Sequence, residues 1–442
     1  MTSHFLFATV PLISHVNQAL TLVKVLVERG NTVTWLTGEG FRPTVEAAGA
    51  RFSPLPPDID FSVNPPDKLF PGHRNLQGLS RLKFELKHFY IQSALAQVKA
   101  LEHICSVDKV DLIVSERAFV GVSAFHELGG PPFASYSIAI LPFLSNETAP
   151  VGLGLRPNAS FFGKLRNRAL NSLCKDLLFK DVTNFMNQER KKLGLGPAAA
   201  SFFEQGISPY LYLQGTAPIF EYPRSNLPRQ IHFVGPFLPE KPHQWTAPDW
   251  WEKLRDTGKK VIHVTQGTVA TDPQDLLFPT LEAIKDGSYT VVATCKGVDG
   301  KLLGRISSSQ DVFTAEFIPH YYLLPHVDLM ISNGGYAGVQ AALSHGIPLV
   351  VAGTTEDKAE VANHVEWSGA GINLRCQRPS PRMLRKAIER VATDSRFKDA
   401  ARGIQKSFEL HDARRTSAEL LEQLARHHQP IIRRAENPWT SF

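Results

Sequence analysis

A histidine near the N-terminus is one of the residues whose type and position could support catalysis. His15 lies between the first apolar run and the first helical segment. Histidine readily takes up a proton near neutral pH, and the ends of parallel strands open on ligand sites. Taken alone, the residue has two interpretations: a general base, or a histidine that caps a helix or lies at the surface.

A glycine turn in the second half of the chain is another candidate. The predicted strand Asp328–Ser332 ends in Asn-Gly-Gly at 333–335, and a helix is predicted to begin at Tyr336. Glycines let the backbone approach a ligand closely, and the N–H groups at a helix start suit a diphosphate. Such turns also occur where nothing binds, so the pattern alone leaves both interpretations open.

The composition favours a globular protein of about two domains. The chain has 442 residues, of which 43% are hydrophobic and 20% are charged, so it can fill a core and shows no bias toward disorder. Its 48 Lys and Arg residues exceed its 42 Asp and Glu residues only slightly. The resulting net charge of +6 argues against a nucleic-acid-binding protein.

Cysteine usage and hydropathy indicate the compartment. The four cysteines lie far apart and form no CxxC pair, which is typical of free thiols in a reducing compartment. The sequence contains no apolar run of about 18 residues that could span a bilayer. We therefore expect a cytoplasmic protein without a membrane anchor, and a monomer.

Short apolar runs alternate with helical periodicity in both halves of the chain, which predicts an α/β fold with two parallel sheets. A cluster of prolines between the halves marks a linker. The predicted division is an N-terminal domain over 1–220, a linker over 221–258, a C-terminal domain over 259–425 and a tail over 426–442 that packs on the N-terminal domain. One long helix is predicted over Ala400–His428. The predicted strands are Phe5–Val10, Thr32–Leu36, Arg51–Leu55, Val110–Ser115, Pro132–Ser137, Lys260–Gln266, Tyr289–Cys295, Val312–Ala315, Asp328–Ser332, Ile347–Val351 and Gly371–Leu374.

The densest basic segment of the chain is also rich in apolar side chains. Between residues 161 and 192, lysines and arginines interleave with phenylalanines and leucines in a helical pattern. Such a segment either contacts an anionic membrane or forms an ordinary helix with a solvated face. We expect the second.

The segment from Phe317 to Gly371 resembles the donor-binding signature of the family 1 UDP-glycosyltransferases, which include bacterial macrolide, plant and fungal natural-product enzymes. The likeness extends over essentially the whole chain. It implies the GT-B fold, in which two Rossmann-like, doubly wound parallel-sheet domains face each other across a cleft. It also implies transfer of a hexose from a nucleotide sugar.

The resemblance assigns the nucleotide end of the donor to particular residues of the C-terminal domain. Phe317 stands where the family has a tryptophan that stacks on the base, with Ile318 beside it, and His320 replaces a glutamine near the base. Asn333 replaces the histidine that contacts the phosphates. The turn after the first strand of this domain adds Gln266, Gly267 and Thr268.

The same resemblance assigns the phosphate cradle and the sugar site. Ala341 occupies the position of the glutamate that binds the ribose. The backbone cradle for the phosphates is matched by Gly335, Tyr336, Ala337 and Gly338. The acidic residues that bind the sugar hydroxyls are matched by Glu356 and Asp357, and Lys358 replaces the glutamine that the family has next to them.

His15 coincides with the general base of the family. The family pairs this histidine with an aspartate after the fourth strand, and here the run over 110–115 leads into Glu116. Glu116 would hold the imidazole tautomer and stabilise its protonated form. Asp111, at the start of the same strand, is a competing carboxylate, and Glu116 is also typical of a charge at a helix N-terminus.

The implied reaction is metal-independent and inverting. His15 takes the acceptor proton while the acceptor oxygen attacks the anomeric carbon opposite the diphosphate, whose charge is met by Thr268, Asn333 and the N–H groups of 335–338. UDP-glucose is the expected donor, with no cofactor. The expected acceptor is a small apolar or aromatic natural product of secondary metabolism, such as a phenol, flavonoid or polyketide. Candidate acceptor-lining residues are Phe84, Phe89, Phe119, Ile138, Leu141, Phe143 and Leu144.

Other functions fit the sequence less well. Asp58 and Asp60 resemble the DxD pair that holds Mn²⁺ in other glycosyltransferases, but they follow a proline-rich loop, and no two histidines are four residues apart. The first βα turn has no GxGxxG fingerprint, which disfavours a nicotinamide enzyme. The altered donor positions leave open a non-catalytic nucleotide-sugar-binding or activator protein, and the architecture leaves open a sugar-nucleotide epimerase.

Overall fold

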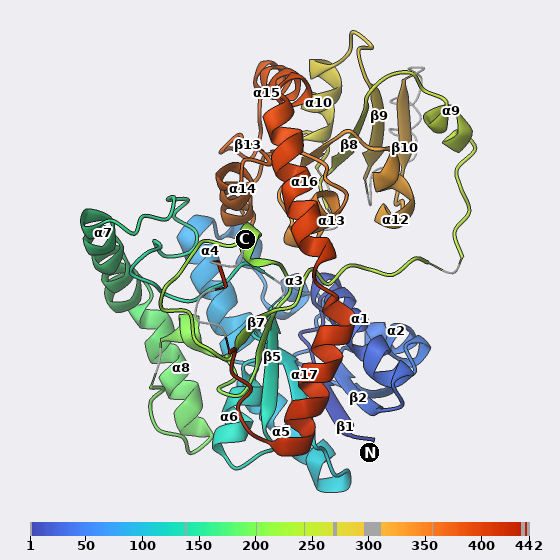
Figure 1. The fold of residues 1–442 in the computed structure, drawn as a ribbon. Coiled ribbons are helices and arrows are strands. Elements are labelled where there is room, and N and C mark those ends of the chain that lie inside the picture. Colours follow the sequence, from blue (N-terminus) through green and yellow to red (C-terminus); the bar gives the residue numbers. More distant parts are fainter. Residues whose placement is uncertain are drawn as a thin grey trace.

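The chain forms two α/β domains, each built on one parallel sheet with helices packed against it (Figure 1). This confirms the predicted fold class. Within the described part of the chain, no helix is both long and apolar enough to cross a lipid bilayer. The computed structural model describes residues 2–137, 139–199, 201–242, 244–267, 272–295, 311–355, 357–434 and 438–439.

The N-terminal sheet has seven strands in the order β3-β2-β1-β4-β5-β6-β7. The sequence predicts the first five along the chain but not β6 and β7, which have only three residues each. β7 lies inside the predicted linker and nevertheless pairs with β6. The strands are β1 His4–Ala8, β2 Thr32–Thr37, β3 Arg51–Pro54, β4 Leu112–Glu116, β5 Phe133–Ser137, β6 Tyr212–Gln214 and β7 Ile231–Phe233.

The first helix, α1 (Ile13–Glu28), begins four residues before its predicted start at Asn17. His15 therefore lies in the first turn of this helix and not in the loop that precedes it. Val16, Leu22 and Leu26 bury the apolar face of α1 against the sheet.

The remaining helices of the N-terminal domain cover the sheet and extend to one side of it, where α7 and α8 form the edge of the domain in Figure 1. These helices are α2 Arg42–Ala47, α3 Pro66–Leu69, α4 Gly78–Glu85, the π-helix η3 Leu86–Ile91, α5 Ala94–Val107, α6 Gly121–Glu127, α7 Phe161–Ser172, the π-helix η4 Leu173–Leu178 and α8 Lys180–Lys192.

The C-terminal sheet has six parallel strands in the order β10-β9-β8-β11-β12-β13, and the sequence predicts all six. The strands are β8 Val261–Thr265, β9 Thr290–Thr294, β10 Val312–Ala315, β11 Leu329–Ser332, β12 Leu349–Val351 and β13 Gly371–Asn373. The helices are α9 Trp251–Arg255, α10 Leu277–Ala283, α12 His320–Leu323, α13 Tyr336–Ser344, α14 Lys358–Trp367, α15 Pro381–Thr393, α16 Ser395–Glu409 and α17 Ala413–His427.

The end of the chain crosses back to the N-terminal domain. The prediction of one helix over 400–428 is wrong, because the chain breaks between α16 and α17 and Asp412 caps the second helix by accepting from Arg415 N at 3.0 Å. α17 packs on α1, and Arg29 Nε lies 2.8 Å from Glu422 Oε1. In the tail, Trp439 Nε1 donates to the carbonyl of Pro218 at 2.9 Å. The N-terminal domain is thus completed by residues from the end of the sequence.

Candidate active site

The candidate site residues follow the central strands of both sheets. The strand order of the N-terminal sheet reverses between β1 and β4, and that of the C-terminal sheet reverses between β8 and β11. Ligands of doubly wound folds bind at the carboxyl ends of the strands at such reversals. His15 and Glu116 follow β1 and end β4, whereas Gly267 and Asn333 follow β8 and β11.

His15 and Glu116 form a close pair. His15 Nδ1 lies 2.7 Å from Glu116 Oε1, and the same oxygen accepts from Val10 N at 2.9 Å. Glu116 is 1% exposed and His15 is 9% exposed. Because a carboxylate only accepts, the neutral imidazole carries its proton on Nδ1, and Nε2 keeps the lone pair that can take up a proton. The short distance between the ring and a buried carboxylate is the feature on which a role for His15 in proton transfer can be proposed.

Asp111, the competing carboxylate, lies at the opposite end of β4. Its Oδ2 accepts from His4 N at 2.8 Å, so it joins the starts of two strands. Tyr136 is the register partner of Glu116 on β5. Burial raises the pKa of the Tyr136 hydroxyl well above its ordinary value, and the charge of Glu116 adds to this effect, so the hydroxyl stays protonated.

The glycine turn after β11 is shaped by close packing. Gly334 has φ +88°, and a Cβ at this position would lie 2.9 Å from Val351 Cγ1. Gly334 N donates to Ser332 Oγ at 3.1 Å, and the side chain of Asn333 donates to the carbonyl of Gln266. The turn therefore requires glycine and is fastened to the loop after β8.

The loop after β8 is positioned by its own side chains. Gln266 Nε2 donates to Asp272 O at 2.7 Å, and its Oε1 accepts from Leu277 N at 3.0 Å. The Gln266 side chain thus holds the start of α10, while its backbone and Gly267, with φ +71°, form the part of the loop beside Asn333. Thr268 lies outside the described residues.

The residues assigned to the nucleotide base have different surroundings. Phe317 is 71% exposed after β10, whereas Ile318 is buried in the core of the domain. Burial lowers the pKa of His320 to about 4, and repulsion from His345 adds to this effect, so its imidazole is neutral near pH 7. The exposed ring of Phe317 is accessible for stacking, whereas the side chain of Ile318 is part of the hydrophobic core of the domain.

In the first turn of α13 the backbone is accessible to solvent, but the side chain of its first residue is buried. Ala337 is exposed, and Gly335 and Gly338 are partly exposed. In contrast, Tyr336 is buried, and its hydroxyl accepts from Gln214 Nε2 of the N-terminal domain at 3.4 Å. Tyr336 therefore contacts the other domain, which differs from the sugar-facing position that the resemblance implies.

Asp357 and Lys358 lie where β12 gives way to α14. Asp357 is the N-cap residue of α14, but its side chain makes no capping hydrogen bond. Lys358 is buried, with Nζ 3.5 Å from Thr355 Oγ1. Glu356 lies outside the described residues, and Ala341 is buried.

The contact between Tyr336 and Gln214 links the parts of the candidate site that belong to the C-terminal and N-terminal domains. β4, β5 and β6 are adjacent, so Glu116 and Gln214 end neighbouring parts of the same sheet edge. In Figure 1, β1 runs from the N-terminus toward the C-terminal domain, and α13 lies at the side of that domain nearest the N-terminal one. The start of α13 and the His15–Glu116 pair therefore belong to facing edges of the two sheets.

A buried polar cluster that the sequence does not reveal lies beside this contact. Glu221 Oε1 accepts from Gln214 Nε2 at 3.0 Å and from Leu141 N at 2.9 Å. Its other oxygen lies 3.6 Å from Nε2 of His364 on α14, and the His364 ring stacks on Tyr222 at 3.8 Å between centroids. These residues join the two domains.

Several residues predicted to line the acceptor pocket belong to the hydrophobic core instead. Phe119 and Leu141 are fully buried in hydrophobic clusters, and Ile138 lies outside the described residues. Phe84 and Phe89 belong to an aromatic cluster around Phe70, with ring centroids 5.8 and 5.3 Å from it. Phe143 is also buried, and Leu144 is half-buried.

The second of the two DxD-like aspartates holds a loop. Asp60 is buried, and its Oδ2 accepts from Glu39 N at 2.7 Å while Oδ1 accepts from Ser62 N at 2.9 Å. Both carboxylate oxygens of Asp60 are therefore engaged by the protein.

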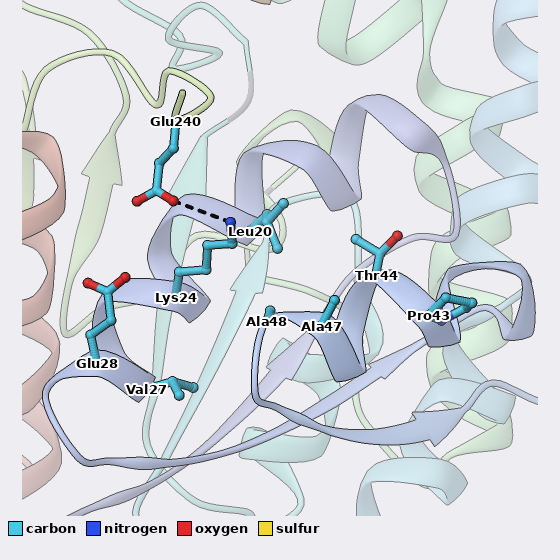
Figure 2. A pocket seen from close by; sticks show the side chains of 9 residues that line it. All are labelled: Leu20, Lys24, Val27, Glu28, Pro43, Thr44, Ala47, Ala48 and Glu240. Atoms are coloured by element: carbon cyan, nitrogen blue, oxygen red, sulfur yellow. Dashed lines mark hydrogen bonds and ion pairs between the residues drawn. The ribbon is translucent and has the colours of Figure 1, made fainter. Parts of the chain in front are cut away.

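A groove of about 610 Å³ lies between α1 and α2 (Figure 2). Across it, Lys24 Nζ lies 3.2 Å from Glu240 Oε2. None of the predicted catalytic or donor residues is among its lining residues. It is lined by Leu20, Lys24, Val27, Glu28, Pro43, Thr44, Ala47, Ala48 and Glu240.

Comparisons with known proteins identify the relatives of the chain. Residues 280–424 match the family described as erythromycin biosynthesis protein CIII-like, C-terminal domain. The chain is 40% identical to 4'-demethylrebeccamycin synthase of Lentzea aerocolonigenes over 96% of its own length and 100% of that protein. It is 35% identical to UDP-glycosyltransferase 2 of Phaeomoniella chlamydospora over 96% of both chains. The crystal structure of the kitacinnamycin glycosyltransferase, at 18% identity, shares the fold with a TM-score of 0.71 over 96% of this chain and 98% of that one.

Proposed function

The chain belongs to the natural-product glycosyltransferases of family 1 with the GT-B fold, and on this premise we propose that it transfers glucose from UDP-glucose to a hydroxyl of a small apolar acceptor, without a metal and with inversion. The observation that carries the proposal is the His15–Glu116 pair, 2.7 Å apart, at the strand reversal of the N-terminal sheet. The name of the fungal relative, UDP-glycosyltransferase 2, supports a UDP-linked donor.

In this proposal, His15 Nε2 removes the proton of the acceptor hydroxyl as its oxygen attacks the anomeric carbon. Glu116 keeps the proton of the neutral ring on Nδ1 and stabilises the positive charge that develops on the imidazole. The Val10 N–H and the burial of Glu116 fix the carboxylate, so little reorganisation is needed during the reaction.

The C-terminal domain would stabilise the leaving UDP. Gly335, Ala337 and Gly338 present backbone N–H groups at the positive end of α13, where a diphosphate charge is favoured. Phe317 would stack on the base, since its ring is exposed beside the buried Ile318. Asp357, whose side chain does not cap α14, would accept hydrogen bonds from the sugar hydroxyls.

The test is a transfer assay with UDP-glucose and a series of phenols and aliphatic alcohols, followed by NMR of the anomeric proton in the product. We expect a β-glucoside from the α-linked donor, and His15→Ala should lower turnover on alcohols by about 10²–10⁴-fold. Phenols of low pKa should lose less, because they need less help in losing a proton. An α-glucoside, or a His15→Ala variant with undiminished turnover on alcohols, would contradict the proposal.

A further inference from the structure

Helix α7 presents large apolar side chains to solvent, whereas two of its asparagines face the protein. Phe161 and Phe162 are 78% and 79% exposed. In contrast, Asn167 is fully buried, and its Nδ2 donates to Asn146 O at 3.0 Å. Asn171, one turn further, donates to Ser145 O at 2.8 Å. The solvated polar face that the sequence predicts is present, since Lys164 and Arg168 are exposed. An ordinary amphipathic helix would bury its large apolar side chains, however, and α7 exposes them.

The exposed apolar side chains form one stripe along α7, and basic side chains flank it. Residues four apart share a helix face, so Phe161 and Leu165 follow one line, with Phe162 beside it. Leu173 is exposed at the start of the following helix η4. The same spacing places Lys164 and Arg168 on one side of this stripe and Arg166 on the other. We call the stripe and its three basic residues the α7 surface.

The charge around the α7 surface is mainly positive, although Lys164 Nζ lies 3.2 Å from Glu147 Oε1. Residues 148–175 contain five Lys or Arg residues and no Asp or Glu. They also include Val151, Leu153 and Leu155, which are exposed in the loop before α7. Exposed aromatic side chains flanked by basic ones match the interface of a bilayer with anionic headgroups, where apolar rings enter the acyl boundary and cations meet the phosphates.

The α7 surface is also connected to the active-site side of the molecule. The loop before α7 reaches the C-terminal domain, where Gly152 N donates to Oε2 of Glu360 on α14 at 2.9 Å. Arg156 of the same loop lies 3.7 Å from Glu366 of that helix. α14 begins directly after Asp357. One continuous segment therefore runs from the outer α7 surface to the neighbourhood of the donor site.

We propose that the α7 surface docks the protein on an anionic lipid bilayer. Phe161, Phe162 and Leu165 would enter the headgroup boundary, and Arg168 with its basic neighbours would contact lipid phosphates. The binding is peripheral and reversible, because a single helix face and a few cations provide the attraction. It places the enzyme where apolar acceptors concentrate.

The test is sedimentation of the full-length protein with vesicles, without donor or acceptor. The wild type should bind vesicles of phosphatidylcholine mixed with phosphatidylglycerol, bind pure phosphatidylcholine vesicles weakly, and dissociate as salt is raised. The double variant F161S/F162S should bind at least about tenfold more weakly, because it loses two buried rings. Lys175, exposed in the following helix η4, extends the basic side of the α7 surface. The double variant R168E/K175E should lose about tenfold or more on anionic vesicles.

Matched controls separate docking from folding and from total charge. Val107→Ser removes an equally exposed apolar side chain from the end of α5, and R382E/K386E makes the same charge change on α15. Both controls should bind like the wild type, and all variants should keep the wild-type melting temperature. A wild type that ignores anionic vesicles, or F161S/F162S that binds them normally, overturns the proposal. Self-association through Phe161 and Phe162 without vesicle binding overturns it in favour of a protein interface.

Discussion

Replacing Glu116 by glutamine tests the catalytic pair most directly, because the substitution keeps the shape of the side chain and removes its charge. Glu116 is 1% exposed and lies 2.7 Å from His15 Nδ1, so solvent cannot replace the lost partner. A charge-assisted hydrogen bond of this kind contributes about 1.5–3 kcal/mol, which corresponds to a loss in turnover of about 10- to 150-fold.

A change in the tautomer of the His15 imidazole would add to this loss of turnover. The amide of glutamine can donate to Nδ1, which would move the imidazole proton to Nε2 and leave no lone pair to receive the acceptor proton. In that case the loss approaches the roughly 10⁴-fold known for the analogous change in the serine-protease triad. We therefore expect Glu116→Gln to lower kcat by about 10- to 10⁴-fold with little change in the affinity for UDP.

Asp111→Asn is the matched control for this experiment. Asp111 begins the strand that Glu116 ends, and it accepts a hydrogen bond from His4 N rather than from a catalytic group. The control should keep wild-type kcat even if it loses some stability. Steady-state kinetics with an alcohol acceptor and calorimetric UDP binding decide the outcome. Wild-type turnover in Glu116→Gln, or an equal loss in Asp111→Asn, would refute the role given to Glu116.

Three further predictions address the donor site and its surroundings. Asp357→Ala should weaken the binding of UDP-glucose but leave the affinity for UDP and the melting temperature unchanged. The control Asp412→Ala removes a capping side chain, so it should lower the melting temperature and leave the affinity for both ligands unchanged. Calorimetry of ligand binding and of unfolding distinguishes the two variants. Burial lowers the pKa of His320 to about 4 in the folded protein, so below about pH 6.5 the unfolded chain binds more protons than the folded one. The free energy of unfolding should therefore decrease as the pH falls from 6.5 toward 4. In His320→Gln, the midpoint of denaturant unfolding should decrease less over this pH range. Transfer should persist in excess EDTA, since the N–H groups of α13 meet the diphosphate charge; activity that EDTA abolishes and Mn²⁺ restores would contradict this.

The sequence predicts the central strands well because they are long, apolar and bounded by turn residues. β1 and β11 coincide with their predicted runs to within a few residues. β6 and β7 could not be found in this way, since three residues do not establish a period and the surrounding prolines indicate a linker. The break before α17 left a signal, because Asp412 is a favoured N-cap residue, but the helical periodicity on both sides concealed it.

The site was predictable where its residues follow strands and unpredictable where they depend on the meeting of the domains. His15 and Glu116 come together because β1 and β4 are neighbours, which the order of βα units already favours. The orientation of Tyr336 could not be foreseen, since a buried hydroxyl needs a partner and its partner, Gln214, ends a strand that the sequence does not reveal. The exposure of the apolar side chains of α7 was also hidden, because the periodicity of its side chains does not say which face is buried.

The contact between the domains also bears on how the proposed general base and the proposed donor cradle stay aligned. Glu221 is fully buried, and it contacts Gln214 of its own domain and His364 of α14, the helix that begins after Asp357. Removing one member of a buried polar cluster leaves the others without compensation, so such a cluster tolerates few alternative domain arrangements. The residues to which we assign the chemistry therefore lie at strand ends fixed within each domain, whereas their alignment between the domains depends on Glu221 and its neighbours.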